Sequence, residues 1–312
     1  MRIFISGSLA YDRILDYKGL FGDHILPEKI HDINVSFYVD SLEESYGGTA
    51  GNIAYTLALL GDDAVIVANA GNDFEPYQNW LQSRHIDTGR IRINGNVRTA
   101  FATVMTDQKY NQISAFYPGA MQLPYALSER TIDRDAFVIV GPGNPEDMRA
   151  IPEFCRTHGI PFMFDPGQQI GNISDEDIKK GMEGAKVCIV NDYERALITK
   201  KTGWSAEDML THTEILVTTF GANGSEIRKG NMIIKVPAGT PKNTIDPTGA
   251  GDAYRAGFMH GLLKGWPLET IGKLAGLVAC YTVELRGTQT HIFNPVSLAA
   301  RYKENFKETL PS

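Results

Sequence analysis

The sequence predicts an α/β fold in which helices cover both faces of a mostly parallel sheet. Short apolar runs recur along the 312-residue chain, and segments with helical spacing of apolar residues separate them. Strands with continuous apolar side chains are typical of sheets that are buried on both faces. The predicted strands are Arg2 to Ser6, Ala64 to Ala68, Ala136 to Val140, Pro161 to Phe164, Val187 to Val190 and Ile215 to Thr218.

A small or polar residue follows most of these runs. These residues are Gly7, Gly141, Asp165, Asn191 and Thr219. Ligands of open α/β sheets bind outside the carboxyl ends of the strands, so we expect all five residues on one rim of the sheet. The functional site is therefore predicted at that rim.

Two regions, at about 14–42 and 96–118, interrupt the alternation of strands and helices. They contain alternating patterns such as Val35 to Val39 and Thr99 to Val104. The patterns predict a small antiparallel sheet that is inserted into the main fold and acts as a lid. No repeat or linker divides the sequence, so residues 1–312 are predicted to form a single domain.

Composition and charge exclude several classes of function. The formal net charge of -7 argues against a broad nucleic-acid-binding surface, which normally needs a basic stripe. No stretch approaches the roughly 20 apolar residues of a membrane span, and the N-terminal apolar run is too short for a signal peptide. We expect a cytoplasmic protein with no membrane or nucleic-acid partner.

The strongest local signal is the segment 246–252, DPTGAGD, which precedes a stretch of small and apolar residues at helical spacing. Backbone N–H groups of Gly249, Ala250 and Gly251 can converge on an anion at a helix start, where the helix dipole adds attraction. Asp252 is unusual there because a carboxylate repels phosphate, unless it takes the proton of an attacking hydroxyl. An ordinary glycine-rich turn with an aspartate at the helix start is the alternative.

This segment resembles the C-terminal signature of the ribokinase-like (PfkB) family of carbohydrate and nucleoside kinases. Far upstream, residues 47–54, GGTAGNIA, resemble the Gly-Gly signature of the same family. Residues 191–194, NDYE, are similar to its N-x-x-E element, and residues 218–224, TTFGANG, to its nucleotide-binding loop. The resemblance covers nearly the whole chain. It implies a ribokinase-like fold and a phosphotransferase that moves the γ-phosphoryl group of ATP to an alcohol group.

The resemblance also implies roles for individual residues. Asp252 is expected to be the catalytic base. Gly249, Ala250 and Gly251 are expected to hold the charge that develops on the transferred phosphoryl group. The expected ATP-binding residues are Asn191, Thr219, Gly221 and Gly224.

By the same resemblance, Asn191 and Glu194 are expected to position Mg²⁺ through the ATP phosphates and water. An asparagine followed three residues later by glutamate also has the spacing of a helix N-cap with its capping box, and both interpretations can hold together. Family members often use a monovalent cation such as K⁺. Asp246 and Thr248 are the positions where we would look for it.

The acceptor is expected to bind at Asp12, Gly48 and Asn52. A carboxylate can accept hydrogen bonds from two neighbouring hydroxyls, such as the cis-diol of a ribose, and an asparagine side chain can both donate and accept. The alternative for Asp12 is a solvated turn residue after the first strand.

The aromatic side chains Phe37, Phe101 and Phe116 of the lid offer flat apolar faces for a nucleobase. Alternatively, they only pack the lid onto the core. No evident cluster of basic residues is present to bind the second phosphate of a sugar phosphate. The N-terminal and lid segments look like those of bacterial adenosine or broader nucleoside kinases. The prediction is therefore a kinase of purine salvage that phosphorylates the 5′-hydroxyl of a ribonucleoside.

Three alternatives remain open at this point. Ribokinase or another sugar kinase is the second choice within the family. A nucleotide-binding regulator without activity and a hydrolase with paired carboxylates belong to other classes. The sequence is compatible with both a monomer and a homodimer, since an exposed edge of the lid can pair with another copy.

Overall fold

The structure is a computed structural model that describes residues 1–109, 111–128 and 131–311. The strands are β1 (Ile3–Ser6), β2 (Ala10–Asp16), β3 (Ser41–Gly47), β4 (Ala64–Gly71), β5 (Ile91–Asn94), β6 (Ala100–Thr106), β7 (Gln112–Tyr117), β8 (Phe137–Val140), β9 (Phe162–Phe164), β10 (Ala185–Asn191), β11 (Thr213–Thr219), β12 (Ser225–Lys229) and β13 (Met232–Val236). The α-helices are α1 (Thr49–Leu60), α2 (Glu75–Ser83), α3 (Pro145–His158), α4 (Asp175–Met182), α5 (Asp192–Thr202), α6 (Ala206–His212), α7 (Ala250–Leu263), α8 (Leu268–Val283) and α9 (Pro295–Phe306). Short 3-10 helices are η1 (Phe21–Asp23), η2 (Pro27–Asp32), η3 (Gly119–Gln122), η4 (Gly167–Gly171) and η5 (Gly221–Asn223).

Within the described residues, the main sheet has nine strands in the order β13-β12-β11-β10-β9-β8-β1-β4-β5. Neighbouring strands from β11 to β5 run parallel, and the hairpin of β12 and β13 adds an antiparallel edge. All six strands predicted from apolar runs are present. The predicted α/β class with a mostly parallel sheet is therefore confirmed.

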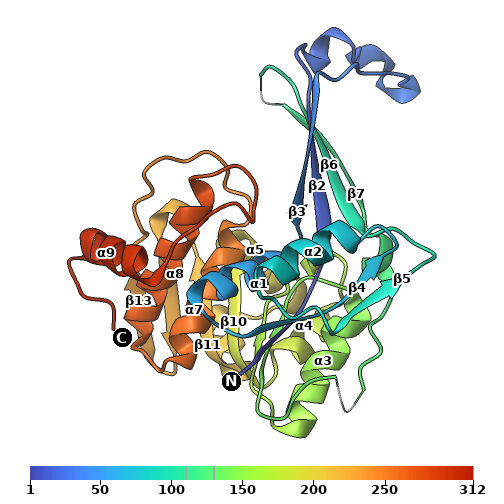
Figure 1. The fold of residues 1–312 in the computed structure, drawn as a ribbon. Coiled ribbons are helices and arrows are strands. Elements are labelled where there is room, and N and C mark those ends of the chain that lie inside the picture. Colours follow the sequence, from blue (N-terminus) through green and yellow to red (C-terminus); the bar gives the residue numbers. More distant parts are fainter. Residues whose placement is uncertain (110, 129–130, 312) are drawn as a thin grey trace.

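Each core strand buries side chains on both faces, which explains its continuous apolar sequence. In β1, Ile3 and Ile5 pack into the cluster under α1, α2, α7 and α8, while Phe4 packs into the cluster under α3 to α6. The helices thus form a layer on each face of the sheet (Figure 1). Among the helices of the described ranges, none is long and apolar enough to cross a membrane.

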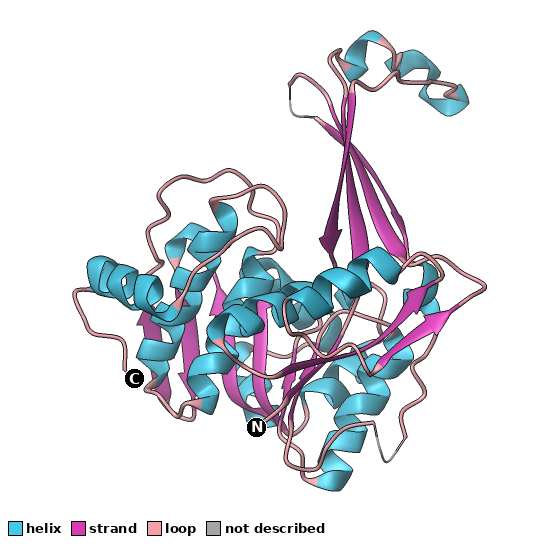
Figure 2. Ribbon diagram, viewed as in Figure 1, coloured by secondary structure: helices cyan, strands magenta, loops and turns pink. Residues whose placement is uncertain are grey.

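A second sheet of four strands, in the order β3-β2-β6-β7, projects from the main body (Figure 2). The strands β3 and β7 pair antiparallel with their neighbours, whereas β2 and β6 run parallel. Both β2 and β6 enter this sheet directly from the main body, which explains their common direction. We call the four strands and the segment 17–40 between β2 and β3 the lid.

The lid differs in detail from the sequence prediction. In the first lid region, expected at about 14–42, β2 begins earlier, at Ala10, and β3 ends later, at Gly47. The alternating segment Val35 to Val39 is not a strand but an irregular connection after η2, so that prediction was wrong. Its Phe37 packs instead against the aromatic ring of Phe21 at the outer end of the lid. Residue 110, which falls within the expected lid, lies outside the described residues.

The packing of α4 on β9 gives a test of the core. A Cβ atom at Gly181 would lie 2.2 Å from the ring of buried Phe164. Gly181→Ala gains about 1 kcal/mol of helix propensity, but overpacking costs about 1–3 kcal/mol. We expect a net loss in the free energy of unfolding, measured by denaturant unfolding. In a Phe164→Leu background the same change should be nearly neutral; an equal loss there would contradict this explanation.

Candidate active site

The first turn of α7 forms an anion cradle at the carboxyl rim of the main sheet. Gly249 precedes the helix with φ of 79°, a left-handed conformation that glycine adopts without strain. A Cβ atom at this position would lie 2.9 Å from the side chain of Thr288. The N–H groups of the first helical turn have no intrahelical carbonyl partner, although that of Ala250 donates to the carbonyl of Pro247 at 3.2 Å. The helix dipole makes this end positive. The turn Gly249–Gly251 can therefore bind a phosphate group.

Asp252 lies in the same turn, half-buried beside this cradle. Its Oδ2 accepts a hydrogen bond of 2.8 Å from Nδ2 of Asn52 on α1. Burial raises the pKa of Asp252 to about 6, while the positive charge of Arg255 and the bond from Asn52 act in the opposite direction. A carboxylate with this pKa is ionised at neutral pH and still basic enough to accept a proton.

Asp12 and the Gly-Gly turn, where the acceptor is expected, lie near Asp252. Asp12 is on β2, and a Cβ atom at Gly47 would lie 2.2 Å from its Oδ2. Gly48 has φ of 87°, and a Cβ atom there would lie 2.6 Å from the carbonyl oxygen of Ser8. Burial raises the pKa of Asp12 to about 6, and the charges of Asp246 and Asp252 add to this shift. This corner suits a ligand that donates hydroxyl hydrogen bonds.

The register of the lid strands separates the predicted aromatic residues. Asp12 lies opposite Ala102, and Ala102 opposite Phe116, so Phe116 shares the lid face of Asp12. Phe101 pairs with Tyr11 and therefore lies on the other face. There its ring lies 4.4 Å from the guanidinium of Arg13. Phe101 therefore lies on the face away from Asp12 and is not among the acceptor-binding residues that we propose.

A cavity of about 520 Å³ lies on the other side of the cradle. Its lining includes the predicted residues Thr219, Gly221 and Gly224, together with Ala250 and Gly251 of the cradle. Most of the remaining walls come from the loop after β13 and from α8, and Ser225 on β12 and Tyr254 on α7 add to them. Because the cavity and the cradle share two residues, a nucleotide in the cavity can place its terminal phosphate at α7.

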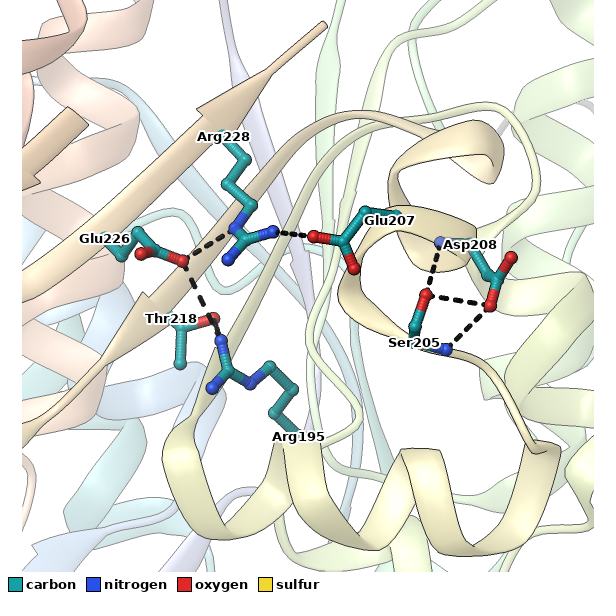
Figure 3. A network of polar contacts seen from close by, with 7 residues as sticks. All are labelled: Arg195, Ser205, Glu207, Asp208, Thr218, Glu226 and Arg228. Carbon is teal, nitrogen blue, oxygen red and sulfur yellow. Dashed lines mark hydrogen bonds and ion pairs between the residues drawn. The ribbon is translucent and has the colours of Figure 1, made fainter. Parts of the chain in front are cut away.

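The turn between β11 and β12, which borders this cavity, is held by a network of polar contacts (Figure 3). Arg228 donates from Nε to Glu226 at 2.6 Å, and its Nη1 lies 2.5 Å from Glu207 on α6. Arg195 on α5 donates to the hydroxyl of Thr218 at 3.3 Å and lies 3.9 Å from Glu226. The network ties α5 and α6 to both strands and so fixes the turn.

Asn191 and Glu194 form the capping box that was the alternative to their functional role. Oδ1 of Asn191 accepts from the backbone N–H of Glu194 at 2.7 Å, and the Glu194 carboxylate accepts from the backbone N–H of Asn191 at 2.8 Å. Asn191 also lies opposite Thr219 in the register of β10 and β11, which places it beside the cavity. Glu194 is 3.9 Å from Arg255.

Sequence reasoning missed the ion pair between Arg255 and Asp165. Asp165 follows β9 and is 1% exposed, and Nη2 of Arg255 donates to its Oδ1 at 2.6 Å. Burial raises the pKa of Asp165, and Arg255 opposes this shift. An arginine inside the small and apolar pattern of α7 was the available signal, because a buried arginine needs an acidic partner.

The arrangement offers little direct protein coordination for a metal. In the part of the chain that the structure describes, no three His, Cys, Asp or Glu side chains cluster closely enough to hold an ion. Glu194 keeps free lone pairs beside the cradle, which fits Mg²⁺ bound mainly through phosphates and water. At the position expected for a monovalent cation, the Asp246 carboxylate accepts hydrogen bonds from the backbone N–H groups of Thr248 at 3.0 Å and Gly287 at 3.1 Å.

Comparison with known proteins gives matches over nearly the whole chain. Residues 7–294 match the model of the pfkB family carbohydrate kinases. A nucleoside kinase of Methanothermobacter thermautotrophicus is 34% identical, with 83% of this chain and 85% of that protein covered. The structure of Burkholderia thailandensis nucleoside kinase with inosine has a TM-score of 0.88 and 34% identity, covering 99% of this chain and 100% of that one. Its complex with ADP-inosine has a TM-score of 0.86 and 35% identity, covering 99% and 98%.

The buried ion pair predicts a compensating pair of substitutions. Arg255→Met leaves Asp165 buried without a cation and should lower the free energy of unfolding by about 3–5 kcal/mol. The double variant Asp165→Leu/Arg255→Met replaces both charges by apolar groups and should recover most of this loss. Denaturant unfolding measures both effects. Equal losses in the single and double variants would show that Arg255 stabilises the fold by other contacts.

Proposed function

The chain belongs to the pfkB family of carbohydrate kinases, and we propose that it is an ATP-dependent kinase that phosphorylates the 5′-hydroxyl of a ribonucleoside. As a family member it is a phosphotransferase whose acceptor is an alcohol group. One observation carries the proposal for the site. Asp252 and the cradle lie between a cavity of nucleotide size and the Asp12 carboxylate.

In the proposed reaction, Asp252 takes the proton of the 5′-hydroxyl while the oxygen attacks the γ-phosphorus of ATP. A new P–O bond forms to the nucleoside, the bond to the β-phosphate oxygen breaks, and the products are ADP and a nucleoside 5′-monophosphate. The N–H groups of Gly249, Ala250 and Gly251 stabilise the negative charge on the transferred group. Asp252 is then left protonated and returns its proton to solvent.

The nucleotide is proposed to bind at Thr219, Gly221 and Gly224, with Asn191 beside them. Mg²⁺ would neutralise charge on the phosphates, and Glu194 would orient its water ligands. A monovalent cation such as K⁺ would have its place near Asp246 and Thr248. There it would add positive charge behind the cradle without contacting the acceptor.

The acceptor is proposed to be adenosine or a similar ribonucleoside, as in purine salvage. The ribose diol would donate hydrogen bonds to Asp12, and Gly48 and Asn52 would form the rest of the acceptor site. Phe116, which shares the lid face of Asp12, would stack on the base when the lid closes. Phe37, at the outer end of the lid, would approach the base only in that closed state. Closure would exclude water, so that ATP is not simply hydrolysed.

The proposed enzyme acts in the cytoplasm as a monomer or a homodimer. The edge strand β7 of the lid is exposed along its whole length and offers unpaired backbone groups to a second copy. The mass in light scattering decides between the two states.

A panel of acceptors tests the function directly. ADP formation with Mg²⁺ and ATP should occur with adenosine, inosine, guanosine or cytidine, and not with ribose, fructose or fructose 6-phosphate. Asp252→Asn should reduce turnover by about 10²–10⁴-fold, because the general base is lost, with ATP affinity nearly unchanged. Turnover with sugars alone would make the protein a sugar kinase, and full activity of Asp252→Asn would remove Asp252 from the mechanism.

The diol contact gives a separate prediction for Asp12. Asp12→Ala should weaken nucleoside binding by about 10–100-fold, the loss expected for hydrogen bonds to a charged group. Calorimetric titration with the nucleoside and with its 2′,3′-dideoxy analogue measures this effect. The wild type should distinguish the two ligands and the variant should not. Equal discrimination by both proteins would rule out the diol contact.

A further inference from the structure

A chain of hydrogen bonds leads away from Asp252 toward the outside of the molecule. Nδ2 of Asn52 donates to Asp252 at 2.8 Å, and Oδ1 of Asn52 accepts from Nε2 of Gln289 at 3.1 Å. Oε1 of Gln289 accepts from the indole Nε1 of Trp80 on α2 at 3.0 Å. Asn52 is 5% exposed and Gln289 is 3% exposed. Water therefore does not replace these partners, and each amide depends on them.

Trp80 determines the direction of every bond in this chain. An indole nitrogen only donates, so the oxygen of the Gln289 amide must face Trp80 and its nitrogen must face Asn52. The oxygen of Asn52 then faces Gln289, and its nitrogen faces Asp252. A half-turn of the Asn52 amide would place a carbonyl oxygen against the carboxylate of Asp252. The chain of hydrogen bonds from Trp80 to Asp252 excludes that arrangement.

The second N–H group of Gln289 is also occupied. Nε2 lies 2.5 Å from the hydroxyl of Tyr77, which donates to the carbonyl of Gly47 at 2.8 Å. A Cβ atom at Gly51 would lie 1.9 Å from that hydroxyl and 3.0 Å from Nε2 of Gln289. Gly51 thus leaves the space in α1 that both side chains occupy, which gives this third glycine of the upstream signature a physical reason.

Thr288 is a second donor to Asn52. Its hydroxyl lies 2.7 Å from Oδ1 of Asn52 and 3.0 Å from the carbonyl oxygen of Tyr46. A hydroxyl carries one proton and can serve only one of these acceptors at a time. The amide of Gln289 has an N–H group for each of its two acceptors, so it can donate to Asn52 and Tyr77 at the same time.

We propose that Gln289 and Trp80 are positioning residues for the phosphoryl transfer, because they keep the amide N–H of Asn52 directed at Asp252. This role rests on the proposed function of Asp252 as base. The oriented N–H stabilises the ionised carboxylate and occupies its Oδ2. The other oxygen, Oδ1, is left for the proton of the acceptor hydroxyl. Neither Gln289 nor Trp80 contacts the reacting atoms.

Several other groups influence the titration of Asp252. Besides burial and Asn52, these are Arg255 on its own helix, which lowers the pKa of Asp252, and Glu194 on α5, which raises it. Asp165 after β9, Asp12 on β2 and the phenol of Tyr77 on α2 also face Asp252, whose charge raises their own pKa values. Neutral substitutions at Gln289 and Trp80 leave the charges of Arg255, Glu194, Asp165 and Asp12 in place. Gln289→Met also removes the contact with Tyr77, which Trp80→Phe keeps. A change in the titration of Asp252 that both variants share therefore reports on the amide of Asn52.

The test compares Gln289→Met and Trp80→Phe with the wild type, and uses Trp266→Phe as a matched control remote from this chain. In each protein the pKa of Asp252 is followed by ¹³C NMR of labelled aspartate carboxyls, with Asp252→Asn for assignment. The pH profile of kcat is recorded in parallel. For Gln289→Met we expect the pKa and the acidic limb of kcat to rise by about one unit, the size of one hydrogen bond to a charged group. Turnover below that limb should fall about tenfold.

Trp80→Phe should shift both quantities in the same direction by less, and Trp266→Phe should shift neither. Unchanged titration of Asp252 in both Gln289→Met and Trp80→Phe would overturn the proposal, whatever happens to their thermal stability. If Gln289→Met does not fold, Trp80→Phe decides alone. The NMR titration needs no turnover, so an inactive wild-type protein would refute the proposed function while the positioning of Asn52 is still measured.

Discussion

The proposed site depends on keeping a carboxylate beside the cradle where we propose that phosphate binds. Asp252 and the Gly249–Gly251 cradle share one helical turn, and a triphosphate next to Asp252 is repelled unless positive charge is supplied. The helix dipole supplies part of it. Arg255, one turn further along α7, lowers the pKa of Asp252 and forms an ion pair with Asp165 after β9. The ion pair joins α7 to the main sheet, and the remaining positive charge would have to come with the nucleotide.

The donor side of the site is rigid because its contacts lie within the main body. The network of Arg195, Glu226 and Arg228 fixes the β11–β12 turn, and the capping box of Asn191 and Glu194 fixes the start of α5. The acceptor side differs, since Asp12 and Phe116 belong to a projecting sheet. The proposed nucleotide site thus lies within the main body, whereas the proposed acceptor site includes residues of the projecting lid.

Much of this arrangement followed from the sequence. Continuous apolar runs predicted the strands because both faces of the sheet are covered, and the DPTGAGD segment predicted the cradle from its small residues at a helix start. The lid was less predictable. Alternation at Val35 to Val39 had no partner strand, and the face of Phe101 depends on the register between β2 and β6.

The polar partners of the site could not be predicted from spacing. Asp165 and Arg255, or Asn52 and Gln289, are distant in sequence and meet only through the packing of α1 and α7 on the sheet. A buried arginine in an apolar pattern indicates that some acidic partner exists, but not which one. Local sequence patterns predict where helices and strands begin and end. Contacts between residues of different elements can be identified only from the folded structure.

The row of lid residues that shares the face of Asp12 has an evolutionary consequence for the proposed acceptor site. Ser45, Asp12, Ala102 and Phe116 lie side by side across four strands, and α7 contributes none of them. Substitutions in this row can therefore change the accepted molecule without altering the cradle or Asp252. Specificity would then diverge by exchange of a few side chains on one face of the lid, while α7, which carries the proposed base and cradle, would tolerate fewer substitutions.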